Sequence, residues 1–306
     1  MHGRRGRFAP AMKSVLFALL VVVAGCSRRE EPTPRPQPEG SGSGSAVAAP
    51  NVPPPYTPSA DVSDPLKAAI AATDRSVDDR MLDAGRHPGE VLEFFRVAPN
   101  QKIGELFAGG GYTTELMART VGANGTIYAQ NSKEILEKFA RKPWTERAAK
   151  PANKNVVGVE RPIDDPFPPE AKDLDAVITI LNYHDVVWMK ADRPKMNKAV
   201  FDALKPGGVY GIVDHSAVVG SGIRDVETLH RIELDVVKQE VLAAGFTLDG
   251  ESDVLRVPGD ARDWSTSPRV AGEKRGTSDR FTLRFVKPGG PAPPPSTGSG
   301  KAKLPF

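Results

Sequence analysis

The strongest limit on the fold is a predominantly apolar run at residues 174–183, LDAVITILNY, which is apolar on both of its faces. A run that is apolar on both faces is typical of a strand in the middle of a parallel sheet, because helices cover such a sheet on both sides. Further strand patterns precede and follow this run, and amphipathic helical patterns alternate with them. Strands that alternate with helices predict a doubly wound α/β fold.

The bounds of these elements follow from the apolar periods and from the Gly and Pro residues that interrupt them. The other strands are expected at residues 102–108, 125–130, 155–161, 209–217, 246–251 and 279–287. Helices are expected at residues 64–74, 89–97, 112–122, 133–142, 193–208 and 226–245. The last two strands are placed to pair as an antiparallel edge. The elements together predict a seven-stranded, mostly parallel, Rossmann-like sheet in one domain at residues 61–288.

The N-terminal segment has the pattern of an export signal. Arg4, Arg5, Arg7 and Lys13 precede an apolar run of 12 residues, SVLFALLVVVAG. This run is shorter than the about 20 residues that a membrane-spanning helix needs. The pattern therefore predicts a secretory signal peptide at residues 1–25, with an N-terminal anchor helix as the alternative.

The apolar run ends in Val23-Ala24-Gly25-Cys26, which resembles the bacterial lipoprotein box. The resemblance implies a lipid on Cys26 and a lipid-anchored protein of the bacterial cell envelope. Because Ser27 rather than Asp follows, it implies the outer membrane, facing the periplasm.

Two further segments are too rich in Pro, Gly and Ser to build a core. Residues 26–60 are interpreted as a tether between the lipid and the domain. Residues 289–306 are expected to be a disordered tail.

Cysteine content and charge argue against a disulfide-stabilised fold and against a nucleic-acid-binding protein. The chain holds one cysteine, so no intramolecular disulfide is possible and the domain depends on an apolar core. The net charge of the chain is +3, and the four basic residues before the apolar run account for all of it. The rest of the chain is therefore close to neutral. Nucleic-acid binding needs a concentrated basic surface, so a nucleic-acid partner is not expected.

The stretch IGELFAGGGYTTELMA combines a strand, a glycine turn and the start of a helix. Glycines lack a Cβ atom and let the backbone approach a ligand, and the N–H groups of a helix N-terminus favour an anionic group. A dinucleotide fingerprint would need a further glycine at Thr114, so a nicotinamide cofactor is disfavoured. An ordinary structural turn is the alternative to a cofactor site.

Four segments, in this order, resemble the landmarks of class I S-adenosylmethionine-dependent methyltransferases: IGELFAGGGY, LDAVITILNYHD, LKPGGVYGIVD and EVLAAGF. The YHD, DHSA and GTSDRF segments resemble more narrowly the predicted, poorly characterised bacterial methyltransferases. The resemblance implies S-adenosylmethionine as the cofactor. The methyl acceptor would be a small molecule or an envelope component.

The resemblance also implies contacts to the methionine part of this cofactor. Ala108, Gly109 and Gly111 would lie along it, and Glu105 would contact its amino end. Phe107 stands where the family usually has a glycine, which is a departure from the pattern.

The remaining implied contacts come from later strands. Gln130 and Asn131 stand at the end of the second strand, where the family usually has an acid that binds the ribose hydroxyls. Asp164 or Asp165 would meet the adenine amino group, or belong to a solvated loop. Asn182, at the end of the fourth strand, is the last of the implied contacts to the cofactor.

His184, Asp185 and His215 are the candidate catalytic residues. They follow the fourth and fifth strands, and ligands of doubly wound folds bind at the carboxyl ends of strands. Methyl transfer depends on alignment, and a base such as histidine is needed only when the acceptor carries a proton. The alternative is that these histidines are hydrogen-bonded packing residues.

A metal site at the same edge is another alternative. His184, Asp185, Asp214, His215 and His230 offer imidazole and carboxylate ligands that suit zinc or manganese. The chain has no H-x-x-x-H or H-E-x-x-H pair, and no metal is expected.

A second function stays open beside the methyltransferase. An exported binding or scaffold protein can keep the fold without the activity, since fold alone does not assign function. The missing ribose acid favours it, as does export away from the cytoplasm, where the cofactor is made. A metal-dependent hydrolase is a third option. Arg80 and Arg280 are expected on the surface.

Overall fold

The computed structural model describes residues 56–289, which include the predicted domain at 61–288. The predicted signal peptide, the lipid site at Cys26, most of the tether and nearly all of the predicted tail lie outside the described residues. Within residues 56–289, no helix combines the length and the apolar character needed to cross a membrane.

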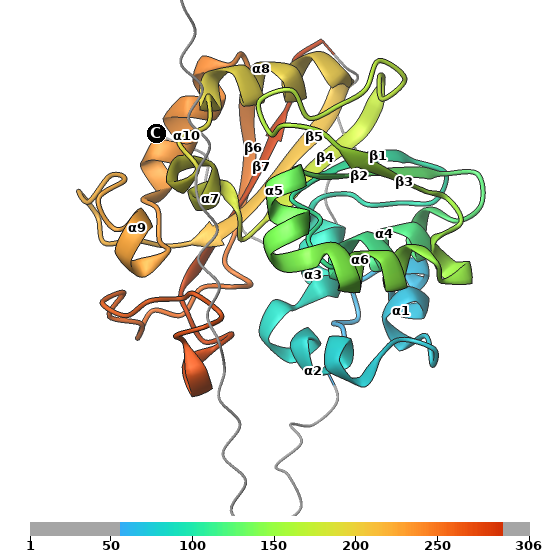
Figure 1. Cartoon of the computed structure of the whole chain (residues 1–306), viewed down its shortest axis with the longest axis horizontal. Helices are drawn as coiled ribbons and strands as arrows, with labels where there is room; N and C mark the ends of the chain where they lie inside the picture. Colours follow the sequence, from blue (N-terminus) through green and yellow to red (C-terminus); the bar gives the residue numbers. More distant parts are fainter. Residues whose placement is uncertain (1–55, 290–306) are drawn as a thin grey trace, which may run out of the picture. The chain divides into compact units, whose positions relative to one another are not determined.

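The described residues form one seven-stranded sheet with the order β3-β2-β1-β4-β5-β7-β6 (Figure 1). The strands are β1 (Lys102–Leu106), β2 (Thr126–Asn131), β3 (Val156–Glu160), β4 (Leu174–Ile180), β5 (Leu204–His215), β6 (Thr247–Ser252) and β7 (Arg280–Val286). Strands β1 to β5 pair in parallel, whereas β7 pairs antiparallel with β5 and with β6. The predicted fold class is therefore confirmed. The strand order reverses between β1 and β4, which makes this point the topological switch of the sheet.

Helices cover both faces of the sheet. In residues 56–289 they are α1 (Asp64–Ala71), α2 (Val77–Arg86), α3 (Pro88–Phe94), α4 (Tyr112–Val121), α5 (Lys133–Ile135), α6 (Arg141–Ala148), α7 (Tyr183–Trp188), α8 (Arg193–Ala203), α9 (Val226–Leu229) and α10 (Leu234–Ala243). Apolar side chains of α1, α3 and α4 pack on one face, and those of α7, α8 and α10 pack on the other.

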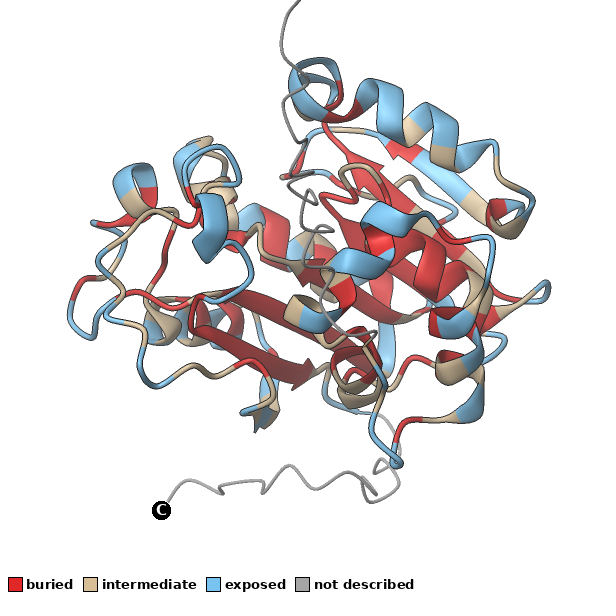
Figure 2. Ribbon diagram, turned by 90° about the horizontal axis from the view of Figure 1, so that it is seen from below, coloured by how far each residue is buried: buried red, intermediate tan, exposed pale blue. Residues whose placement is uncertain are grey.

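Most residues of the central strands are buried (Figure 2). In β4, Ala176 and Ile178 belong to the core under α1, α3 and α4, while Val177 belongs to the opposite core. Side chains of a strand alternate between the two faces, so both must be apolar when both faces are covered. This explains the apolar run from which β4 was predicted.

The prediction of one helix at residues 226–245 is wrong. The helix breaks into α9 and α10, and His230 between them adopts a left-handed conformation with φ 51° and ψ 49°. Arg231 is fully buried, forms an ion pair with Asp260 at 2.8 Å and donates to the Ser216 carbonyl at 3.0 Å. These long-range contacts override the helical period.

Three smaller differences concern element bounds. The helix expected at 133–142 continues to Ala148 through a π-helical segment, Leu136–Ala140, that joins α5 to α6. The strand expected to extend to Tyr183 ends at Ile180, and Tyr183 begins the short helix α7. Strand β5 already begins at Leu204, where α8 has ended, because Pro206 cannot continue a helix.

Candidate functional site

The glycine turn links the end of β1 to the start of α4 and is held by side chains of β2. Phe107, Gly109 and Gly111 have φ angles of 53°, 57° and 80°, in the left-handed region that favours glycine. The buried Gln130 side chain accepts a hydrogen bond from the Phe107 N–H at 3.1 Å. The buried Asn131 side chain accepts one from the Gly109 N–H at 2.8 Å. These two amides therefore support the turn from behind.

Glu105 lies buried below the same turn, on β1. Its carboxylate accepts a hydrogen bond from the Thr114 hydroxyl at 2.5 Å. Burial raises the pKa of Glu105 from 4.5 to about 7, although the Thr114 hydroxyl and the charge of Arg147 act in the opposite direction. The predicted contact residue is thus an acid that titrates near neutrality.

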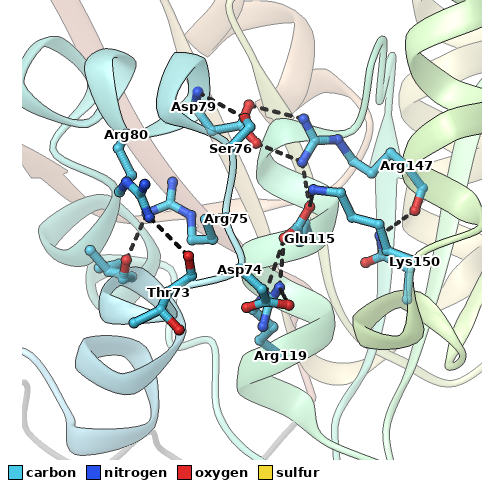
Figure 3. Close-up of polar contacts among 12 residues, drawn as sticks. Thr73, Asp74, Arg75, Ser76, Asp79, Arg80, Glu115, Arg119, Arg147 and Lys150 are labelled. Carbon is cyan, nitrogen blue, oxygen red and sulfur yellow. Dashed lines mark hydrogen bonds and ion pairs between the residues drawn. The ribbon is translucent and has the colours of Figure 1, made fainter.

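A charged network holds three helices around the turn (Figure 3). Arg147 of α6 donates to the Gly110 carbonyl at 2.5 Å and pairs with Asp79 of α2 at 2.8 Å and Glu115 of α4 at 2.5 Å. Burial favours the neutral form of Glu115, but Lys150, Arg119 and Arg147 outweigh it and lower its pKa. Arg147 is separated from Gly110 and Asp79 by 37 and 68 positions, so no local pattern predicts the network.

A pocket opens between the first turn of α4 and the ends of β4 and β5. It is lined by Arg86, Pro88, Val91, Leu92, Tyr112, Thr113, Leu116, Ile180, Leu181, Val213, Leu255 and Arg280. This is the carboxyl edge of the sheet at the switch between β1 and β4, where doubly wound folds bind ligands. The sequence predicts a ligand site at this edge but does not identify the residues that line it.

Two guanidinium groups stand in the otherwise apolar wall of this pocket. Arg86 stacks over the Tyr112 ring at 4.4 Å. Arg280 donates to the Gly85 carbonyl at 2.7 Å, and burial together with the charge of Arg86 lowers its pKa to about 10. No carboxylate of residues 56–289 forms an ion pair with either one. Arg280 is 4% exposed, which corrects its expected surface position, whereas Arg80 is exposed as predicted.

The candidate catalytic residues lie together next to this edge. His184, in the first turn of α7, is buried and places Nδ1 2.7 Å from Asp214 Oδ1 at the end of β5. Its Nε2 lies 3.3 Å from Asp185 Oδ1. Burial lowers the pKa of His184, but the charges of Asp214 and Asp185 outweigh this effect and raise it to about 9.

His215 and His230 complete this group, the histidine cluster (His184, Asp185, Asp214, His215 and His230). The rings of His215 and His230 lie 5.9 Å and 5.4 Å from that of His184. His215 Nδ1 lies 2.8 Å from the Ser278 hydroxyl. Burial and the neighbouring charge of His184 lower the pKa of His215 well below its usual value. Within the cluster, His184 therefore favours its protonated form and His215 its neutral form.

The other predicted contacts are already engaged. Asp164 pairs with Lys195 of α8 at 3.1 Å, and Asp165 pairs with Arg161. The Asn182 amide donates to Asp185 at 3.0 Å, so it orients a member of the histidine cluster. Ala108, whose N–H donates to the Gln130 carbonyl at 2.9 Å, lies in the turn as expected.

Comparison with known proteins shows the fold. No family model and no curated protein matches the chain. A Galdieria sulphuraria protein described as a candidate sarcosine dimethylglycine methyltransferase superposes with a TM-score of 0.50 at 15% identity, covering 74% of this chain and 91% of its own. The cyclase SpnF superposes with a TM-score of 0.49 at 17% identity, covering 75% of this chain and 94% of its own. An S-adenosylmethionine-dependent methyltransferase from Aquifex aeolicus superposes with a TM-score of 0.47 at 15% identity, covering 65% of this chain and 88% of its own.

Proposed function

We propose that the chain is an S-adenosylmethionine-dependent methyltransferase of the poorly characterised bacterial type, acting on a small molecule or an envelope component. The pocket at the switch between β1 and β4 carries the proposal. Its wall joins the first turn of α4, which directly follows the glycine turn, to the ends of β4 and β5. The histidine cluster lies beyond these strand ends, in α7, at the end of β5 and between α9 and α10. One edge therefore offers both a cofactor turn and a reactive group.

The turn fits this cofactor. A Cβ atom at Gly109 would meet only the Phe107 carbonyl, at 3.9 Å, so the space above the turn is open to a ligand. The first N–H groups of α4 and the guanidinium groups of Arg86 and Arg280 suit a carboxylate. S-adenosylmethionine, when bound, supplies an electrophilic methyl group. Gln130 and Asn131 keep the turn in shape, in place of the acid usual at this point.

The histidine cluster would serve the acceptor. Asp214 accepts hydrogen bonds from the backbone N–H groups of His184 and His215, both at 2.7 Å, and so orients both residues. His215, whose ring is oriented by Ser278, is placed to take a proton from an acceptor that carries one. Alignment of the acceptor with the methyl group would supply the rest of the rate enhancement.

Isothermal titration calorimetry on the full chain tests the proposal. S-adenosylmethionine or its demethylated product is expected to bind with a Kd on the order of micromolar. No heat at millimolar ligand would contradict the methyltransferase and would favour a binding or scaffold protein that only retains the fold.

A matched pair of variants locates the ligand. Gly109→Val is expected to abolish binding, because its side chain would occupy the open space above the turn. Gly272→Val is the control, since Gly272 also has a positive φ, 53° against 57°, and open space around it, but lies far along the chain, before β7. Equal affinity in both variants would place the ligand elsewhere.

We further propose that the protein is exported and anchored by a lipid on Cys26, which is supported by the Val23–Cys26 segment. A Cys26→Ser variant is expected to lose metabolic lipid labelling and to leave the membrane fraction. If the variant stays membrane-bound and labelled, the anchor lies elsewhere.

A further inference from the structure

We propose that His184, Asp185 and His230 form a binding site for a divalent transition-metal ion, with Asp214 as a positioning residue. This site goes beyond the proposed methyltransferase function and does not depend on it. The expectation that the chain binds no metal rested on the absence of a local ligand motif. The break between α9 and α10 creates instead a site whose ligands come from two distant segments.

The ligand atoms lie nearly as close to one another as those of a metal site. One atom of each of His184, Asp185 and His230 lies within 4.8 Å of the others. Asp185 Oδ1 is 3.3 Å from His184 Nε2 and 3.8 Å from His230 Nδ1. Metal–ligand bonds of 2.0–2.1 Å in tetrahedral geometry separate neighbouring ligands by about 3.3 Å. Small side-chain rotations therefore suffice to close the site around an ion.

Asp214 prepares His184 as a ligand. Its carboxylate lies 2.7 Å from Nδ1 of the ring and also accepts the His184 backbone N–H at 2.7 Å. A proton held on Nδ1 leaves Nε2, which faces Asp185, as the ring atom that an ion would bind in place of a proton. Metal-binding histidines commonly have such a carboxylate partner, which fixes the ring and its tautomer. Asn182 similarly holds the second oxygen of Asp185, Oδ2, at 3.0 Å.

The backbone holds His230 in an uncommon conformation that brings its ring to this place. Its left-handed φ of 51° is unfavourable for a residue with a Cβ atom. The Thr266 hydroxyl donates to the His230 carbonyl at 2.8 Å, and the buried ion pair of Arg231 with Asp260 fixes the next residue. Such conformations persist where surrounding contacts enforce them, often at functional sites.

The site is open on one side. The side chain of His184 is 4% exposed, whereas those of Asp185 and His230 are 22% and 28% exposed. An ion can thus reach the site from solvent and keep a position free for water or a substrate atom, as in reactive metal sites with three protein ligands. Two imidazoles and one carboxylate favour zinc, cobalt or iron(II) over magnesium or calcium, which prefer oxygen ligands.

Metal binding to the full chain, freed of metal with a chelator, tests the proposal. Zn²⁺ is expected to bind at one equivalent in calorimetry, with a Kd on the order of micromolar or lower. Co²⁺ is expected to give the visible absorption of a tetrahedral nitrogen and oxygen site. His230→Ala is expected to weaken Zn²⁺ binding at least about 100-fold, and Asp214→Asn about 10- to 100-fold with an altered Co²⁺ spectrum.

His87→Ala is the matched control. His87 also has a left-handed conformation, with φ 44° and ψ 52°, and its side chain is 42% exposed, but it ends α2 outside the cluster. Its loss is expected to leave Zn²⁺ affinity unchanged. The proposal is overturned if the wild-type chain shows no saturable Zn²⁺ binding. It is also overturned if a folded His230→Ala variant, checked by circular dichroism, binds Zn²⁺ as tightly as His87→Ala.

Discussion

Replacement of Glu105 by glutamine is expected to remove a pH dependence of stability that the wild-type protein has between pH 4.5 and about 7. Glu105 lies 5% exposed on β1 and accepts a hydrogen bond from Thr114. Glutamine has nearly the same shape, and its carbonyl oxygen can accept the same bond. The substitution therefore removes the titrating group while keeping the packing.

The magnitude follows from the pKa of this carboxyl group. Burial raises it from 4.5 in the unfolded chain to about 7 in the folded protein, a displacement of about 2.5 pKa units. Because the folded state holds the proton more tightly, the stabilisation is complete below pH 4.5 and is lost as the pH rises through about 7. At about 1.4 kcal/mol per unit, the wild-type protein loses roughly 3 kcal/mol above that pH.

Urea denaturation at pH 5 and pH 8.5 measures this effect. The free energy of unfolding of Glu105→Gln relative to wild type is expected to increase by about 2–3 kcal/mol between the two pH values. Other titrating groups are common to both proteins and cancel in the difference. Glu137→Gln, at an exposed glutamate, controls for the loss of one carboxylate. A difference that is the same at both pH values would refute the assignment of a buried, neutral Glu105.

Three further predictions concern the same scaffold. Thr114→Val is expected to move the midpoint of the Glu105 pH dependence to higher pH, since the Thr114 hydroxyl lowers that pKa; an unchanged midpoint would contradict this. Gly211→Ala is expected to lose about 1–3 kcal/mol in thermal unfolding, because its Cβ would lie 2.6 Å from the Phe95 ring. Gly259→Ala, with open space, is its control. Asp83→Asn is expected to lose about 3–5 kcal/mol in urea unfolding, because Arg75 would stay buried without its partner at 2.7 Å; a loss below about 1 kcal/mol would show that Arg75 is solvated.

Local sequence patterns place part of the candidate site. The strand-turn-helix at Gly109 and the strand ends at His184 and His215 depend on local patterns, and the structure brings these strand ends together at one edge. The engagement of Gln130 and Asn131 with the turn was not predicted, because an amide side chain gives no sign of its partner. Arg86 was also missed, because its place in the pocket depends on the packing of α2 against Tyr112 of α4.

The fold class follows from local periodicity. Residues 174–183 are apolar on both faces, and their alternation with helical patterns is enough to predict a covered parallel sheet, since side-chain direction in strands and helices is fixed by the backbone. The position of His230 does not follow from such a pattern. Its helical period is overridden by the Arg231–Asp260 ion pair, whose members lie 29 positions apart. Contacts of this kind exist only in the packed fold, so the tertiary structure decides which histidines meet at the carboxyl edge.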